Sequence, residues 1–155
     1  MNRSAPSIAI ACLFIWIGFV CAISFMESWL KFQAPGVTIP IGLGIGRLVF
    51  GALNKVEWVF ALIVCFFIVK RSKPYRTLSN GWLALIILLL TLQTLWLLPA
   101  LDARAELYIQ QQPVPPSHLH FWFVGMELVK VAALFITAIS LFKQSYTNTW
   151  SNNRS

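Results

Sequence analysis

Charged residues are scarce in this sequence, and acidic ones are the scarcest. Only 5 of the 155 residues are Asp or Glu, and charged residues make up 11% of the chain, against about a quarter in soluble globular domains. Hydrophobic residues make up 58%. So few charges cannot cover the surface of a soluble domain, and the composition therefore predicts a membrane protein.

The sequence also lacks the usual signatures of disulfide-bonded, metal-binding and catalytic proteins. Its three cysteines, Cys12, Cys21 and Cys65, lie in apolar runs without a CxxC pair, so we expect them to be small hydrophobic residues. No GxSxG, HExxH or phosphate-binding loop is present. These absences favour a binding or structural protein over an enzyme, and a membrane enzyme stays an open alternative.

Four apolar runs are long enough to cross about 30 Å of hydrocarbon as helices. The predicted spans lie at about 8–26, 55–70, 81–98 and 119–142. They predict an all-α fold, a polytopic membrane four-helix bundle with up-down-up-down topology over residues 1–144. A polar tail, residues 145–155, follows and is expected to be frayed.

Local signals refine these spans. Thr38 is a suitable N-cap, so a helix is expected at about 38–54, which either lies in the membrane interface or, as we favour, extends straight into the second span. Pro99 is expected to end the third span, with a short amphipathic helix at Ala103–Gln112. Gln93 in the third span is expected to hydrogen-bond to neighbouring helices.

A cluster of cations determines the expected orientation. Lys70, Arg71, Lys73 and Arg76 lie between the second and third spans, and positively charged loops remain cytoplasmic. This predicts a multi-pass protein of the inner (plasma) membrane with both termini in the cytoplasm. The segment Lys70–Arg76 would then contact anionic lipid head groups, and the net charge of +7 is assigned to lipid contact instead of nucleic acid.

This orientation gathers the acids and histidines at the non-cytoplasmic end. The candidate ligand-binding residues are Glu27, Arg47, Asn54, Glu57, His120, Glu127 and Lys130. Helical geometry places Arg47, Asn54 and Glu57 on one stripe. It places His120, Glu127 and Lys130 on another. Because ionisable residues inside a membrane face the bundle interior or a watery cavity, we expect the two stripes to face each other across an outward-facing polar pocket, with Glu27 beside them.

Two functions are compatible with this pocket. In the first, it binds a metal ion, haem or a small polar ligand, with His120, Glu127 and Glu57 as candidate metal ligands. In the alternative, the protein is a non-catalytic structural or partner subunit of a membrane complex. Its ionic cluster then only fixes helix packing, through the pairs Glu127–Lys130, Glu27–Lys31 and Arg47–Glu57.

Small residues mark two faces where another helix could approach closely. Gly42 and Gly46 form one of them and Gly18 and Ala22 the other. Either face would suit a second copy of the chain or a membrane partner.

Two segments resemble a family of small four-span membrane proteins of unassigned function. Lys31-Phe32-Gln33-Ala34-Pro35 is similar to the family's Phe-x-x-Pro-type segment, and Leu119-His120 is similar to the Leu-His pair that opens its last span. One branch of the family is linked to platinum-drug resistance, and the wider set looks like copper-resistance inner-membrane proteins and four-span protoporphyrinogen oxidases. The resemblance implies a four-helix fold and a link to metal or haem through His120. It departs at Glu127, where the family usually has Asn.

Overall fold

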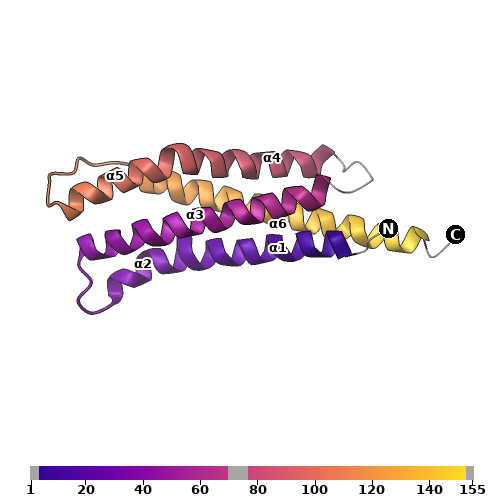
Figure 1. Cartoon of the computed structure of the whole chain (residues 1–155), viewed down its shortest axis with the longest axis horizontal. Helices are drawn as coiled ribbons and strands as arrows, with labels where there is room; N and C mark the ends of the chain where they lie inside the picture. The colour runs from indigo at the N-terminus through magenta and orange to yellow at the C-terminus, as the bar shows by residue number, and fades with distance from the viewer. Residues whose placement is uncertain (1–3, 70–76, 153–155) are drawn as a thin grey trace.

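The computed structural model describes residues 4–69 and 77–152, and helices dominate this part of the chain (Figure 1). The helical elements are α1 (Ser4–Val20), the π-helical segment η1 (Cys21–Glu27), α2 (Ser28–Leu30), the 3-10 segment η2 (Lys31–Gln33), α3 (Ile39–Val69), α4 (Thr77–Leu92), the π-helical segment η3 (Gln93–Leu97), α5 (Leu98–Ile109) and α6 (Leu119–Asn152). They line up as four rods that run alternately in opposite directions, so the predicted all-α four-helix bundle is confirmed.

Four helical stretches are long and apolar enough to cross a membrane. They are Ser7–Gln33, Ile39–Ile68, Gly81–Ile109 and Leu119–Gln144. Each has 26 to 30 residues, which at 1.5 Å per residue gives roughly 40–45 Å, more than the hydrocarbon thickness alone. Length and composition together support a multi-pass membrane protein.

The second rod is one continuous helix, as favoured from the sequence. α3 begins directly after Thr38, whose carbonyl accepts a hydrogen bond from the Gly42 N–H at 2.8 Å. Pro40 lies in the first turn, where its missing N–H removes no helical hydrogen bond. Residues 39–54 therefore form the first half of one continuous helix that is long and apolar enough to cross a membrane.

The third rod is longer than predicted, and the expected break at Pro99 was wrong. Pro99 lies in the first turn of α5, directly after η3, in which the Leu98 N–H donates to the Gln93 carbonyl. The wider π turn shifts the hydrogen-bond pattern where a proline would otherwise interrupt an α-helix. Residues 103–109 thus continue this rod and do not form a separate amphipathic helix.

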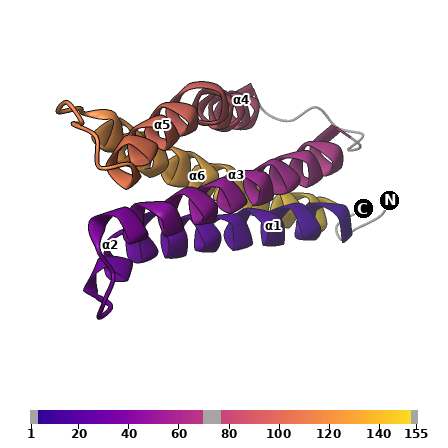
Figure 2. The same ribbon diagram turned by 60° about the vertical axis from the view of Figure 1, so that its left-hand side comes forward.

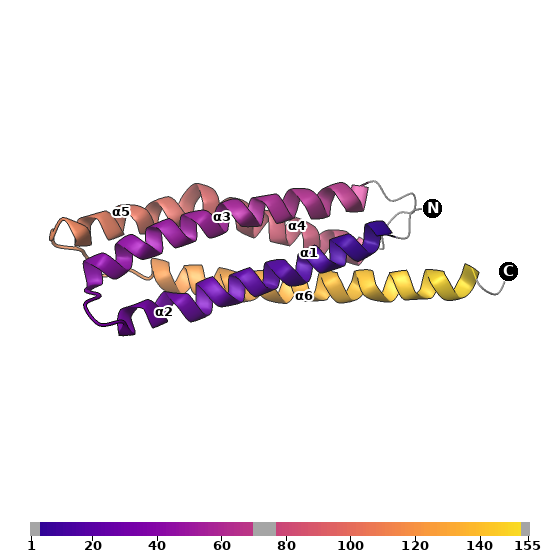
Figure 3. The same cartoon turned by 60° about the horizontal axis from the view of Figure 1, so that its bottom comes forward.

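The polar tail, which was expected to be frayed, is helical as far as Asn152. α6 continues to that residue, and its C-terminal end projects past the other helices (Figure 3). Residues 153–155 lie outside the described part of the chain.

Apolar side chains fill the bundle interior and also cover its outside. α1 packs against α3 and α6, while α6 also packs against α4 and α3 against α5. The largest fully buried apolar side chains are Leu13, Trp16, Val20, Val64, Ile86, Leu90, Leu97, Leu134 and Leu141. Large apolar residues such as Leu48 and Leu95 are 78% and 75% exposed, which suits helices surrounded by lipid.

Candidate functional site

Five polar or aromatic side chains from all four rods meet inside the bundle. Lys130 on α6 is 0% exposed, and its Nζ lies 2.6 Å from Glu57 Oε1, 2.9 Å from Glu127 Oε1 and 2.6 Å from Gln93 Oε1. Trp16 Nε1 donates to Glu57 Oε1 at 2.9 Å, and Gln93 Nε2 donates to Glu127 Oε1 at 2.8 Å. We call this group the ion cluster.

The ion cluster is closed on itself. Lys130 donates hydrogen bonds to Gln93 and Glu127 and forms an ion pair with Glu57, so its ammonium group contacts three segments of the chain. The shared lysine and the amide of Gln93 tie Glu57 and Glu127 to each other. A closed network of this kind fixes the relative rotation of the four rods, because each residue has its partner only in one register.

The ion cluster lies deeper than the sequence predicted. Glu57 was expected at the outer entrance of the second span, but α3 begins at Ile39, which puts Glu57 near the middle of that helix. Lys130 likewise lies near the middle of the apolar stretch Leu119–Gln144. Two of the five acids therefore lie in the bundle interior and not at its outer end.

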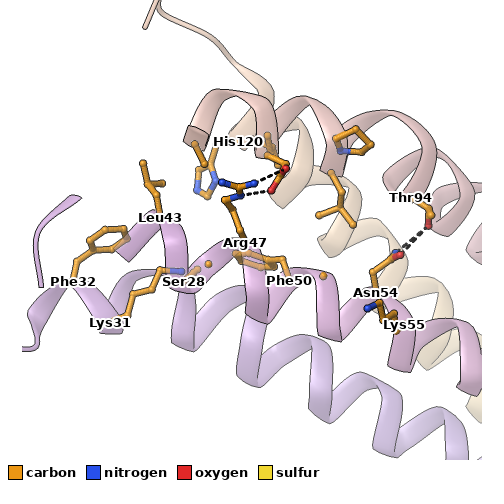
Figure 4. A pocket seen from close by; sticks show the side chains of 17 residues that line it. Ser28, Lys31, Phe32, Leu43, Arg47, Phe50, Asn54, Lys55, Thr94 and His120 are labelled. Carbon is orange, nitrogen blue, oxygen red and sulfur yellow. Dashed lines mark hydrogen bonds and ion pairs between the residues drawn. The ribbon is translucent and has the colours of Figure 1, made fainter. Parts of the chain in front are cut away.

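A separate cavity of about 540 Å³ opens nearer the end of the bundle, between α3 and α5 (Figure 4). Its lining comprises Ser28, Lys31, Phe32, Leu43, Gly46, Arg47, Phe50, Gly51, Asn54, Lys55, Thr94, Leu98, Pro99, Leu101, Asp102, Ala105 and His120. Three of these side chains are basic and one is acidic. Apolar and aromatic groups form most of the remaining wall.

Arg47 lines this pocket and links α3 to α5. Its guanidinium donates to both carboxylate oxygens of Asp102, at 3.0 Å for the Nη2–Oδ2 pair, and also to Glu106. Arg47 was expected to pair with Glu57, and that expectation was wrong, since Glu57 pairs with Lys130. The partners of Arg47 come from the part of the third rod that lies beyond Pro99.

A hydrogen-bonded layer separates the pocket from the ion cluster. Thr94 Oγ1 accepts from Asn54 Nδ2 and from Trp58 Nε1, both at 3.0 Å, and donates to the Leu90 carbonyl at 2.7 Å. Asn54 and Thr94 line the pocket, as Figure 4 shows. Asn54 precedes Glu57 by one helical turn, so the floor of the pocket is adjacent to the ion cluster.

Two glycines of α3 allow the pocket wall to approach closely. A Cβ atom built on Gly42 would lie 2.2 Å from Phe32 Cε1, and one on Gly46 would lie 2.8 Å from Lys31 Nζ. The Gly42 and Gly46 face is therefore covered by the same chain and is not free for a partner helix. Gly18 and Ala22, by contrast, are exposed on α1 and η1.

The seven predicted site residues separate into three groups. Arg47, Asn54 and His120 line the pocket, whereas Glu57, Glu127 and Lys130 form the ion cluster. Glu27 pairs with Lys31 at 3.3 Å, as expected, and its Oε1 is buried without a hydrogen-bond partner. Within the described ranges, no group of three His, Cys, Asp or Glu side chains is placed to hold a metal ion. The predicted metal set of His120, Glu127 and Glu57 is thus not assembled.

Trp16 and Gln93 were missing from the predicted site. Gln93 hydrogen-bonds between helices, as expected, and this amide in an otherwise apolar span was the available signal. Trp16 carried a weaker signal, because tryptophan usually lies near span ends and this one lies well inside the first apolar stretch. A polar N–H at that depth needs a buried acceptor.

No family model, curated protein or solved structure matches the chain. The fold and the two sites define a four-helix bundle of the membrane type with a closed internal ion cluster and an adjacent open pocket. Any function has to be argued from the chemistry of these two features.

Proposed function

We propose that the protein binds a small amphipathic ligand in the pocket between α3 and α5. The observation that supports this is a cavity of about 540 Å³ with mainly apolar walls and a few polar side chains, a size and composition typical of small-molecule sites. Phe32, Leu43 and Phe50 offer surface to an apolar body. The polar side chains at the rim offer contacts to a head group.

The charges of the lining favour a head group that is negatively charged. Lys31, Arg47 and Lys55 are basic, and Asp102 is the acidic residue of the lining. Arg47 is already held by Asp102, and Lys31 by Glu27, so Lys55 is the cation best placed to gain a new partner.

Haem belongs to this class of ligand, since it has carboxylates on an apolar ring. His120 lines the pocket and is the residue that would hold the haem iron, because neutral imidazole coordinates iron. A free metal ion fits the pocket less well. His120 and Asp102 are the lining residues of metal-ligating type, and tight metal sites need more protein ligands than two.

Native mass spectrometry of the protein purified in mild detergent tests the proposal. Gly51 lines the pocket with open space where its Cβ would lie, and Gly125 also has open space but lies outside the lining. Wild type and Gly125→Leu should retain a bound small molecule or take up a photoreactive fatty acid, and Gly51→Leu should lose most of it. A visible absorption band would identify haem. Equal labelling of all three proteins would contradict the proposal.

We infer from the cation count that the pocket opens to the non-cytoplasmic side of the inner membrane. The segment Lys70–Arg76, which carries this inference, lies outside the described residues. The connections at 34–38 and 110–118 lie together at the opposite end of the bundle from residues 69 and 77 (Figure 1). The pocket is at the end where these two connections lie.

A second candidate function is that of a partner subunit, and the exposed Gly18 and Ala22 edge of the first rod favours it. A partner helix on this edge would be lost on substitution of Gly18 by Leu. Cross-linking or analytical ultracentrifugation in detergent would detect the change. A wild-type protein that is strictly monomeric and purifies alone would contradict this role.

A further inference from the structure

We propose that the ion cluster is a binding site for one proton, held by the Glu127 carboxyl group, so that the cluster is electrically neutral. This inference concerns a different place from the pocket and does not depend on what the pocket binds.

The charges of the ion cluster do not balance without such a proton. Among the residues whose burial is described, the buried ionisable side chains are Glu57, Glu127 and Lys130. The other groups that face them are neutral: Trp16 from the first rod and Gln93 from the third. Two carboxylates and one ammonium carry a net charge of −1, and one bound proton removes it.

An unbalanced charge is unfavourable at this depth. Glu57 and Glu127 are 2% and 1% exposed, and both lie well inside stretches long enough to span a membrane. A buried carboxylate without a counter-charge loses hydration that nothing replaces, and protonation is the usual response. A carboxyl group sharing one lysine with a second carboxylate is the group expected to respond in this way.

The hydrogen bonds indicate which oxygen takes the proton. Glu57 Oε1 forms an ion pair with Lys130 and accepts a hydrogen bond from Trp16, and Glu127 Oε1 accepts hydrogen bonds from Lys130 and Gln93. Glu127 Oε2 is buried and has no hydrogen-bond partner. Glu57 also lies closer to Lys130 Nζ, at 2.6 Å against 2.9 Å for Glu127. The ammonium therefore pairs with an ionised Glu57, and the vacant oxygen of Glu127 receives the proton.

A proton suits this place better than a metal cation. Hard cations such as Na⁺ or Ca²⁺ need several oxygen ligands, and no set of acidic or histidine side chains around Glu127 provides them in the described part of the chain. A proton needs one oxygen. Asn54 lines the open pocket and lies one helical turn from Glu57, which offers a short route for proton entry.

Infrared spectroscopy of the protein in lipid nanodiscs at neutral pH tests the proposal by counting protonated carboxyl groups through their C=O stretch and its shift in D₂O. The expected count is one in wild type. It is zero in Glu127→Gln and in Glu57→Gln, because each leaves one carboxylate beside Lys130. It is two in Lys130→Met, because no ammonium remains. Asp102→Asn, a change at the pocket rim, should keep the wild-type count of one.

The position of the proton has its own readout. Gln93→Met removes a donor to Glu127 and should shift the carboxyl band, whereas Trp16→Phe removes a donor to Glu57 and should leave it unchanged. A band that responds only to Trp16→Phe would place the proton on Glu57 and overturn the assignment to Glu127.

Other outcomes would overturn the proposal as a whole. A wild-type protein without any protonated carboxyl band at neutral pH shows that the cluster stays fully ionised, and this measurement requires no variant to fold. A wild-type band that persists in both Glu57→Gln and Glu127→Gln arises elsewhere in the chain. Thermal melting of each variant confirms that the spectra come from folded protein.

Discussion

Lys130 Nζ on α6 and Glu57 Oε1 on α3 lie 2.6 Å apart, with both residues buried. Their helices are diagonal in the bundle, since each packs against α1 while α6 also packs against α4 and α3 against α5. The long lysine side chain thus reaches across the centre. It joins two helices that also contact each other directly through the Phe50 and Phe123 rings, whose centroids lie 5.1 Å apart.

Removing this lysine should destabilise the protein strongly. Lys130→Ala leaves Glu57 and Glu127 buried without their common partner, and breaking a buried ion pair from one side costs about 3–5 kcal/mol. Unfolding in mixed micelles with increasing dodecyl sulfate measures the loss. Lys55→Ala, at an exposed lysine of α3, is the control and should change the stability little. Equal stability of the two variants would show that the ion cluster contributes nothing to the fold.

The layer between pocket and ion cluster should be sensitive to the loss of one hydroxyl group. Thr94→Val removes the acceptor of two part-buried donors, Asn54 Nδ2 and Trp58 Nε1, and such a loss is expected near the lower end of the range of about 1–3 kcal/mol for unsatisfied buried donors. Thr91→Val is a matched control, because the Thr91 hydroxyl donates to the Ile87 carbonyl of its own helix and its loss removes an intrahelical hydrogen bond. We expect Thr94→Val to lower the melting temperature clearly more than Thr91→Val. The reverse order would be inconsistent with a structural role for Thr94.

The sequence predicted the fold well because span length and apolar content are local properties. The four runs, the continuous helix from residue 39 and the helix contacts of Gln93 all followed from such signals. The extension past Pro99 did not follow. The rule that proline ends a helix does not take into account the π-helical segment Gln93–Leu97, which allows the rod to continue past Pro99.

The sequence predicted residues that line the pocket or the bundle interior, but it did not predict how deep in the bundle each of them lies. Arg47 and Glu57 share one face of α3, and ten residues of helix separate them by roughly 15 Å along the axis. Helical periodicity gives the face and not the partner, so one predicted stripe divides between two sites. Arg47 reaches Asp102 at the pocket, while Glu57 reaches Lys130 in the interior.

The close approach at Gly42 should appear as a coupling between two substitutions. Gly42→Ala places a Cβ atom against the Phe32 ring, so the ring must move away from the pocket wall. In a Phe32→Ala background the same substitution meets no ring and should gain roughly 0.5–1 kcal/mol from the better helix propensity of alanine. A double-mutant cycle by chemical unfolding should give a coupling of at least about 0.5 kcal/mol. Gly44→Ala has open space around the new Cβ atom and should stabilise both backgrounds alike.

Cysteine labelling tests both the number of spans and their orientation. The connections at 34–38 and 110–118 lie at the same end of the bundle, so Ala34→Cys and Gln112→Cys, in a background without Cys12, Cys21 and Cys65, should react equally with an impermeant maleimide. The positive-inside rule predicts that they react in intact cells and that Ser72→Cys reacts only after lysis. If both are protected while Ser72→Cys reacts, the bundle is inverted, and the pocket faces the cytoplasm. If Ala34→Cys and Gln112→Cys react from opposite sides of the membrane, an odd number of membrane crossings separates them. The two rods between these positions give an even number, so this result would contradict the four-span arrangement.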